Sequence, residues 1–536
     1  MYAGGLAECP RRRPRRVTPE RGPCRFLRPT PCHCAGARSA VHAHCLRRWQ
    51  TIARANLQWA AGSTCHACNS GYTVNLADDG TRIPMGILGG TGLVGRKLAA
   101  RLVCHPLFSL GPVLGSSATA GQLLSDVWRD KEKALEDHYG RALWEAAPVP
   151  DAIEGILVAS VEALFQSNCK YVISCIAPAL GHLEDALQRA GVVVFSISPH
   201  DRNVARNPLV VPEANGDDLL LSIASAAREP ASFCEDGSPR PQTVPLIKSP
   251  NCVTCGVSVV LKALEDAYGV EGVSVTTFQA LSGRGDAKYD RDLVVANVYP
   301  LAGTIERTDE YQRAELLRIF PRIVRCAVSA HRVPVQNGHF VDLKIQTRSP
   351  VRCADDVKRV LREFAPLSGL GLPSMPRAPI VVVDEAGRPR PKVDSDYEGG
   401  MSVCVGNVNT NDGFFDVSLS LVVNNVVRGA WGAALLNAEL YELHIRPLVG
   451  RAAPKVATHH SPHKAPRRSG DVMAPIEKLA RTKVDAEGSD HPQWGVLLRW
   501  AKGKGSSGNL AVEAHSGAKQ HFGVGPWEEA DDDATS

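Results

Sequence analysis

The middle of the chain, from about residue 82 to about residue 447, alternates short apolar runs with longer amphipathic stretches. Short apolar runs are typical of buried strands, and apolar positions three or four apart are typical of helices. The first half of this region predicts strands at 83–88, 112–114, 155–158, 171–173 and 192–197, and helices at 93–103, 123–138 and 183–190. Strands separated by helices predict an α/β fold with a parallel sheet covered on both faces.

The pattern changes after residue 252. A helical run at 257–267 is followed by longer predicted strands at 273–281, 323–328, 340–347, 402–408 and 415–423, and a last helix is expected at about 427–441. Long strands with few helices between them predict a second, α+β domain on a mixed or antiparallel sheet. We expect the first domain at 82–251, completed by 425–447, and the second at 252–424.

The two ends of the chain have a different composition. Residues 1–80 are rich in Arg, Cys and His, with little hydrophobic periodicity. From residue 448 onward His, Pro, Lys, Arg, Ser and Gly dominate, followed by an acidic end. Such a composition buries too little apolar surface to fold, so 448–536 is predicted to be a disordered tail.

Composition and charge exclude several classes of protein. The 536 residues are 44% hydrophobic and 22% charged, which predicts two or three globular domains. No apolar run could span a bilayer and no secretory signal opens the chain, so neither a membrane nor a secreted protein is expected. Residues 1–83 hold 13 Arg, no Lys and four acidic residues, so the rest of this +5 chain is net acidic. A whole-chain nucleic-acid binder is therefore not expected.

A glycine-rich turn follows the first predicted strand. Gly90, Gly92 and Gly95 fit the dinucleotide fingerprint, in the strand-to-helix context which that spacing requires. Such a turn lets the backbone approach a pyrophosphate and points helix N-terminal amides at the anion, whereas an ordinary strand-to-helix turn is the alternative. The predicted cofactor ligands here are Gly89, Thr91, Gly92, Leu93, Val94 and Gly95. This predicts a Rossmann-like NAD(P)-binding domain.

The end of the second predicted strand carries no carboxylate. Residues 115–121 read Gly-Ser-Ser-Ala-Thr-Ala-Gly, where an Asp or Glu would hold the ribose of NAD. Without that acid nothing repels a 2′-phosphate, so the turn favours NADP, with Ser116 and Thr119 as candidate ligands.

Cys252 is placed at the start of the predicted helix after 249–251. The macrodipole at a helix N-terminus favours a thiolate, which predicts a nucleophile. The alternative, a small core residue, fits Cys255 better because that residue lies one turn further in. Downstream, Gln279 interrupts an apolar strand beside a glycine turn, and Arg332 and His339 end a rigid segment.

These motifs together resemble one family. The glycine turn, Asn251-Cys252, the Gln279 strand, 332–339, 207–215 and 425–432 resemble aspartate-β-semialdehyde dehydrogenase of the archaeal/fungal type, over about 82–447. The resemblance implies NADPH-dependent reduction of β-aspartyl phosphate to aspartate semialdehyde and phosphate, in the biosynthesis of lysine, threonine, methionine and isoleucine. It also implies a small-molecule substrate and a homo-oligomer, either a dimer or a tetramer.

The resemblance also implies roles for individual residues. Cys252 would attack the acyl carbon, His339 would act as general acid/base and Gln279 would orient the acyl group. Arg332 would hold the substrate α-carboxylate in a bidentate fork. The resemblance further implies that Arg202 binds the substrate phosphate, Asn251 lies near the oxyanion, Glu310 binds the substrate amino group and Asn425 contacts the cofactor. For Arg202 the alternative is a solvated charge in a loop.

Several positions depart from the family pattern. Ala118 and Thr119 stand where the family usually has an Arg-Ser pair for the 2′-phosphate, so NAD is also plausible. An expected asparagine is replaced in 196–199, and the acid-then-lysine pair near Glu310 is incomplete. Two alternatives therefore remain open: a malonyl-CoA reductase-like enzyme of the same fold, or a ubiquitin-ligase or scaffold protein whose dehydrogenase domain is degenerate.

The N-terminal segment carries metal-ligand spacing. Cys and His pairs at such separations provide tetrahedral zinc ligands, and the run at 41–49 resembles a RING-variant (RING-CH) zinc finger. The candidate ligands are Cys32, Cys34, His42, Cys45, Cys65 and Cys68. The first Cys pair of that family is missing, and an unstructured segment is the alternative. The resemblance implies a ubiquitin-conjugating enzyme as partner; a cytoplasmic location is expected, with an organelle such as a plastid as the alternative.

Overall fold

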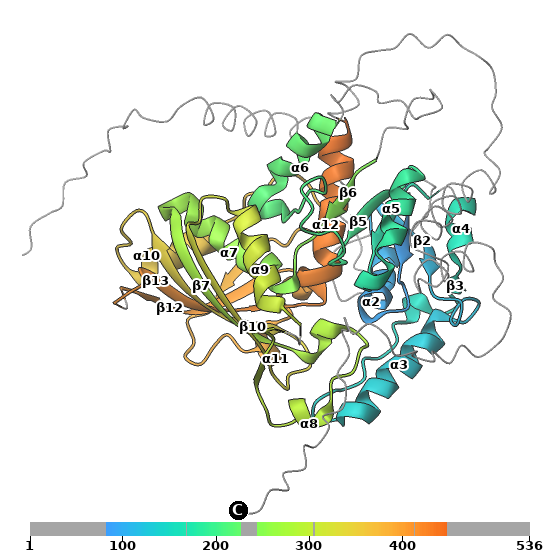
Figure 1. The fold of residues 1–536 in the computed structure, drawn as a ribbon, viewed down its shortest axis with the longest axis horizontal. Coiled ribbons are helices and arrows are strands. Elements are labelled where there is room, and N and C mark those ends of the chain that lie inside the picture. Colours follow the sequence, from blue (N-terminus) through green and yellow to red (C-terminus); the bar gives the residue numbers. More distant parts are fainter. Residues whose placement is uncertain (1–81, 168, 227–243, 304–305, 412, 448–536) are drawn as a thin grey trace, which may run out of the picture. The chain divides into compact units, whose positions relative to one another are not determined.

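The computed structural model of the protein describes residues 82–167, 169–226, 244–303, 306–411 and 413–447 (Figure 1). The six predicted zinc ligands and the predicted tail, 448–536, lie outside the described residues. Among the residues described, no helix is both long and apolar enough to cross a bilayer.

The first part of the chain forms a six-stranded parallel sheet in the order β3-β2-β1-β4-β5-β6. The strands are β1 (Ile83–Leu88), β2 (Phe108–Leu114), β3 (Val158–Ala159), β4 (Tyr171–Ser174), β5 (Val193–Ser196) and β6 (Leu246–Lys248). The helices around it are α2 (Leu93–Val103), α3 (Leu124–Tyr139), α4 (Val161–Gln166), α5 (His182–Arg189) and α6 (Pro212–Ala226), with short turns η1 (Asp151–Ile153) and η2 (Pro178–Leu180). The order reverses at β1, which makes the carboxyl end of β1 a topological switch point.

The apolar pattern explains this sheet. Every residue of β4, β5 and β6 is buried, as expected for strands covered on both faces. Gly90 and Gly95 allow α2 to start directly against β1. A Cβ on Gly95 would lie 2.4 Å from the Gly89 carbonyl oxygen, and one on Gly90 would lie 2.3 Å from Cγ1 of Val113.

The second part forms a seven-stranded mixed sheet in the order β11-β12-β13-β10-β7-β9-β8. Its strands are β7 (Val270–Gln279), β8 (Tyr299–Pro300), β9 (Arg325–Arg332), β10 (His339–Thr347), β11 (Ile380–Val382), β12 (Val403–Thr410) and β13 (Val417–Val423). The pairs β7–β9 and β11–β12 are parallel and the others antiparallel.

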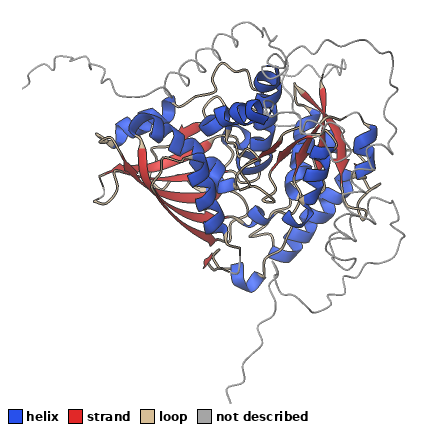
Figure 2. Cartoon of the chain, turned by 45° about the horizontal axis from the view of Figure 1, so that its top comes forward, coloured by secondary structure: helices blue, strands red, loops and turns tan. Residues whose placement is uncertain are grey.

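Helices gather on one face of the mixed sheet (Figure 2). They are α7 (Cys252–Tyr268), α9 (Thr308–Ile319) and α10 (Ala354–Glu363), and the short elements are η3 (Leu281–Arg284), α8 (Arg291–Val294), α11 (Pro391–Asp394) and η4 (Tyr397–Gly400). β7 and β10 alternate buried with partly exposed positions, so the buried positions pack under α7 in one apolar core. The last helix runs through η5 (Val427–Trp431), α12 (Gly432–Leu440) and η6 (Tyr441–Ile445), and α12 packs on β5 and α6.

The predicted fold class is confirmed: a Rossmann-like α/β part is followed by an α+β part on a mixed sheet. β1 and α2 have the predicted bounds. β3 was expected at 155–158 and occurs as two residues, Val158–Ala159, because the chain at 155–157 forms a turn and a bridge instead. α9 and α10 were not predicted; both carry many charged residues on their exposed sides.

A buried ion pair ties α5 to the carboxyl ends of β5 and β6. Lys248 and Glu184 are both inaccessible, and the ammonium donates to the Glu184 carboxylate and to Oγ of Ser196 at 3.1 Å. Ser196 Oγ donates in turn to Glu184 at 2.6 Å. Burial lowers the pKa of Lys248, so the pair is stable only because each charge has its partner.

We therefore expect Glu184→Leu to destabilise the protein by about 3–5 kcal/mol, because it leaves a buried ammonium unpaired. The measurement is the thermal unfolding midpoint of the full chain. The double variant Glu184→Leu/Lys248→Met should recover most of the loss. Asp126→Asn, which breaks an ion pair to Arg129 that is more than half exposed, is the control and should cost less than about 1 kcal/mol. An effect of the first variant no larger than that of the control would show that the buried ion pair does not stabilise the fold.

Candidate active site

Cys252 is the first residue of α7, at the point where the chain leaves β6. The side chain of Asn251 caps the helix by accepting the Val253 N–H at 2.9 Å, which fixes Cys252 at the helix N-terminus. A Cβ on Gly429 would lie 2.5 Å from the Cβ of Cys252. Only glycine therefore allows η5 to pass this close to Cys252.

His339 is the first residue of β10 and is completely buried. Its Nε2 lies 3.1 Å from the sulfur of Cys252. The backbone N–H of Ala280 donates to Nδ1 at 3.0 Å, so the neutral ring carries its proton on Nε2, facing the sulfur. Burial, with Arg332 nearby, lowers the pKa of His339 well below its usual value, which keeps the ring neutral at neutral pH.

The helix N-terminus does not make Cys252 a resting thiolate, contrary to the expectation from the sequence. Burial raises the pKa of Cys252 to about 11, and this outweighs the opposing effects of Arg332, the Val253 N–H and Arg202. The resting site therefore pairs a neutral thiol with a neutral imidazole. Cys255 is buried and its thiol donates to the carbonyl of Pro250 at 3.6 Å, which fits the structural role expected for it.

Arg332 and Gln279 lie side by side at the ends of two strands. They are register partners in the parallel pair β7–β9 and both are almost fully buried. The guanidinium of Arg332 donates to the carbonyl of Ala280 at 2.7 Å, lies over the ring of Tyr289 at 4.5 Å, and leaves a buried Nε without a partner. The amide of Gln279 donates to Oγ1 of Thr277 at 3.2 Å.

Glu306, which the sequence analysis did not single out, is the acid next to Arg332. Its carboxylate accepts from Arg332 at 3.0 Å and from the hydroxyl of Tyr289 at 3.1 Å. The predicted Glu310 instead lies on the exposed side of α9 and pairs with Arg307. The structure thus brings Glu306, not Glu310, to Arg332, because Glu306 precedes α9 whereas Glu310 lies on the exposed side of that helix.

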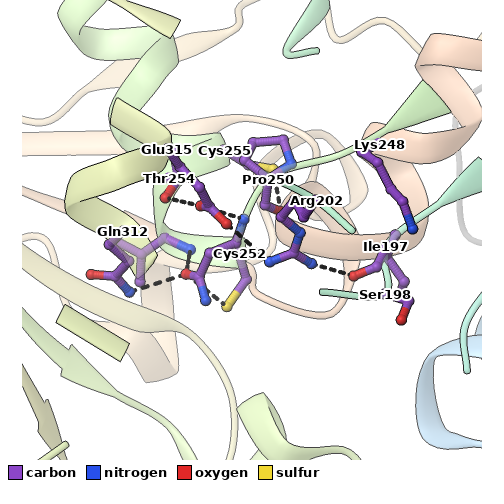
Figure 3. A network of polar contacts seen from close by, with 12 residues as sticks. Ile197, Ser198, Arg202, Lys248, Pro250, Cys252, Thr254, Cys255, Gln312 and Glu315 are labelled. Carbon is purple, nitrogen blue, oxygen red and sulfur yellow. Dashed lines mark hydrogen bonds and ion pairs between the residues drawn. The ribbon is translucent and has the colours of Figure 1, made fainter. Parts of the chain in front are cut away.

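Arg202 lies in the loop after β5 and is buried, not a solvated loop charge. One nitrogen donates to Glu315 at 3.1 Å, another donates to the carbonyl of Ile197, and Nε is buried without a partner (Figure 3). Because Glu315 also contacts the start of α7, Arg202 belongs to the same polar network as Cys252.

Asn425 has a clear structural contact of its own. Its side chain accepts the N–H of Gly338 at 3.0 Å and donates to Oγ of Ser282 at 2.9 Å. It thereby joins the loop before His339 to η3. Its predicted contact with a cofactor stays a prediction.

The glycine turn fits a dinucleotide. Gly89 has a φ of +80°, and α2 has no side-chain cap at Gly92. The first amides of α2 are therefore left for an anion, as a pyrophosphate requires. Ser116 and Thr119 lie at the exposed turn after β2, with their hydroxyl oxygens 3.4 Å apart.

One group of described side chains has metal-ligand composition, namely Asp185, His200 and Asp201. They are partly exposed, and Asp201 also pairs with Arg206 at 2.7 Å. The ion pair with Asp185 raises the pKa of His200, as in an ordinary cluster of ion pairs.

The fold and the site define a nicotinamide-dependent dehydrogenase. Residues 84–222 match the family model for the semialdehyde dehydrogenase NAD binding domain, and residues 261–428 match the semialdehyde dehydrogenase dimerisation domain.

Similar proteins identify the family within this class of dehydrogenases. The aspartate-semialdehyde dehydrogenase of Methanothermobacter thermautotrophicus is 31% identical, covering 67% of this chain and 98% of the relative. That of Cryptococcus neoformans is also 31% identical, covering 67% and 96%. The chain belongs to the aspartate-semialdehyde dehydrogenase family.

Solved structures agree with this fold. The Candida albicans aspartate semialdehyde dehydrogenase, determined with NADP, has a TM-score of 0.55 at 26% identity and covers 68% of this chain and 99% of its own. The Vibrio cholerae aspartate semialdehyde dehydrogenase II has a TM-score of 0.51 at 22% identity, covers 67% and 98%, and supports the fold alone.

The thiol pKa gives a direct test of the site. Below a pKa of about 11 the thiolate fraction rises tenfold per pH unit, so carbamidomethylation of Cys252 by iodoacetamide should be about a hundredfold faster at pH 9 than at pH 7. Peptide mass spectrometry measures the rate, with the exposed Cys353 as reference for the reagent. A plateau already reached by pH 8 would show that the helix N-terminus outweighs burial.

Proposed function

We propose that the chain reduces β-aspartyl phosphate with NADPH to aspartate semialdehyde and inorganic phosphate. The observation that carries this proposal is the 3.1 Å contact between Cys252 and His339, with Arg332 and Arg202 near the sulfur. A nucleophile on which two buried arginines act suits a substrate with an anionic group at each end.

The reaction begins with attack of the Cys252 sulfur on the acyl carbon. The C–O bond to phosphate breaks, the thiol proton leaves with the departing phosphate, and an acyl thioester and inorganic phosphate form. Arg202 would hold the phosphate, Arg332 the α-carboxylate and Glu306 the ammonium group of the substrate. Amides at the start of α7, beside Asn251, would stabilise the oxyanion, and Gln279 would orient the acyl group.

His339 would stabilise the sulfur anion by donating its Nε2–H, and would donate to the substrate oxygen when the thioester is reduced. Relay of the thiol proton through Nε2 requires the other tautomer, whose Nδ1 proton would face the Ala280 N–H. That relay therefore costs one hydrogen bond. NADPH, when bound, supplies the hydride that converts the thioester to a thiohemiacetal, which then releases the aldehyde and restores the thiol.

Two assays of the full chain separate this activity from the acyl-CoA alternative. One supplies aspartate semialdehyde, phosphate and NADP, and the other measures the reduction of malonyl-CoA. Cys252→Ser should abolish turnover with the fold intact. A parent protein without any activity would favour the scaffold alternative. Activity retained in Cys252→Ser would refute the role of Cys252 as the nucleophile.

Arg332→Lys should raise KM for aspartate semialdehyde about 10- to 100-fold, because an ammonium cannot reproduce a two-pronged hydrogen bond to a carboxylate. Steady-state kinetics measures the change. The matched control is Arg325→Lys on the same strand. It changes only an exposed ion pair with Glu271, so KM should stay the same. Equal KM values in the two variants would contradict the role of Arg332.

Cofactor preference follows from the turn after β2. Residues 115–121 contain no basic side chain, so NADP and NAD should bind with dissociation constants within about tenfold of each other. Fluorescence titration of each cofactor measures this. Ala118→Arg should tighten NADP alone by about tenfold, since it adds a cation for the 2′-phosphate. A strong preference of the parent chain for NADP would show that a residue outside 115–121 binds the 2′-phosphate.

We further propose a homo-oligomer, formed through the face of the mixed sheet that the helices leave uncovered. Partly exposed aromatic side chains gather there: Phe278 packs against His331 and Phe340 with ring centroids 5.6 and 5.9 Å apart. The description of residues 261–428 as a dimerisation domain supports this proposal.

For the N-terminal segment we propose zinc bound by Cys32, Cys34, Cys65 and Cys68, with His42 and Cys45 at a second, irregular site. Metal analysis of the purified full chain tests it. A ubiquitin-conjugating partner and a cytoplasmic location are proposed on the same sequence grounds.

A further inference from the structure

The carboxylate of Glu315, on α9, is inaccessible to solvent and uses both of its oxygens. One oxygen accepts from Arg202 at 3.1 Å. The other accepts the backbone N–H of Asn251 at 2.8 Å and the hydroxyl of Thr254 at 2.7 Å. These contacts lie beside Cys252, as Figure 3 shows.

A second residue of α9, one turn before Glu315, reaches the same place. Gln312 is buried, and its amide donates to Oδ1 of Asn251 at 3.0 Å. That oxygen also caps the Val253 N–H, so Gln312 fixes the capping side chain while Glu315 fixes the capping backbone. α9 therefore holds the first turn of α7 from two directions.

The same carboxylate sets the orientation of Arg202. A guanidinium has five N–H donors in a plane, and here Glu315 and the Ile197 carbonyl take two of its nitrogens. Nε stays buried without a partner. A single carboxylate thus joins the arginine proposed for the phosphate to the helix that carries the nucleophile.

We propose that Glu315 is a positioning residue, which holds Arg202 and the N-terminus of α7 in a fixed relation so that the leaving phosphate and the attacking sulfur meet. The assignment of phosphate to Arg202 rests on the proposed function. The hold on Cys252 does not, since it follows from the contacts alone.

Charge gives this role a signature that a merely structural residue would lack. The charged and titratable groups that act on Cys252 come from five places: His339 on β10, Arg332 on β9, Arg202 in the loop after β5, Glu315 on α9 and Cys255 on α7. The arginines lower the pKa of Cys252, whereas Glu315 raises it. Removing the charge of Glu315 should therefore make the thiol more acidic while it loosens the alignment.

The experiment compares Glu315→Gln with the parent full chain in two measurements. The pH midpoint of Cys252 alkylation by iodoacetamide should fall, with several-fold faster labelling at pH 8. Turnover should drop at least tenfold, and KM for phosphate should rise. A more reactive thiol in a slower enzyme is the expected result; an unchanged midpoint, or a midpoint that rises, would overturn the proposal.

Two further variants keep the test decisive. Thr254→Val removes one hydrogen bond to Glu315 and retains the charge, so it should lower turnover by less than about fivefold and leave the midpoint unchanged. Glu439→Gln is the matched control: it is a fully buried carboxylate that accepts the Ser374 N–H at 2.9 Å and contacts His105. It should change stability, but neither the midpoint nor the turnover.

The alkylation measurement separates this proposal from the proposed function. If the parent chain does not turn over aspartate semialdehyde but Glu315→Gln still lowers the midpoint, the substrate assignment fails and the positioning of Cys252 stands. If the parent is active and Glu315→Gln matches it in both measurements, the positioning role fails and the activity stands.

Discussion

The contact between the Cys252 sulfur and Nε2 of His339 is the constraint on which the rest of the site depends. It joins the first turn of α7 to the first residue of β10, which are 87 positions apart in the sequence. Each partner is fixed from behind: Asn251 and Glu315 hold the start of α7, and the Ala280 amide holds the imidazole. The missing side chain at Gly429 then allows η5 to close against Cys252. The sulfur is therefore placed by packing as well as by hydrogen bonds.

The charged side chains near this contact form ion pairs between arginines and carboxylates. Arg332 meets Glu306, and Arg202 meets Glu315, so neither arginine stands uncompensated in a buried site. Each arginine also keeps a buried Nε without a partner. In the proposed function both arginines bind anionic groups of the substrate while their carboxylate partners keep them oriented. Burial keeps Cys252 a thiol at rest, because it raises the pKa of the thiol more than the two arginines lower it.

The cofactor turn is tied to this site by a third buried arginine. Arg96, directly after Gly95 in α2, donates to Glu132 of α3 at 2.9 Å and to both carboxylate oxygens of Asp286, each at 2.9 Å. Asp286 lies just beyond η3, and Gly283 of η3 passes so close to His339 that a Cβ there would lie 3.0 Å from the ring. A fingerprint helix and the active-site loop are thus connected through one side chain. Lys131 adds an ion pair to Asp286 at 3.0 Å.

The local sequence pattern was sufficient to predict much of the fold and part of the candidate site. The bounds of β1 and α2 and the cysteine at a helix start follow from apolar periodicity, glycine spacing and residue type, which act between near neighbours along the chain. The roles expected for Gln279, Arg332 and His339 came from the resemblance to a known family. Three features required the tertiary structure. Glu306 rather than Glu310 reaches Arg332, Glu315 holds the start of α7, and burial makes Cys252 a thiol although the helix N-terminus favours a thiolate. Each depends on which distant segments pack together and how much water they exclude, and no local sequence pattern records either quantity.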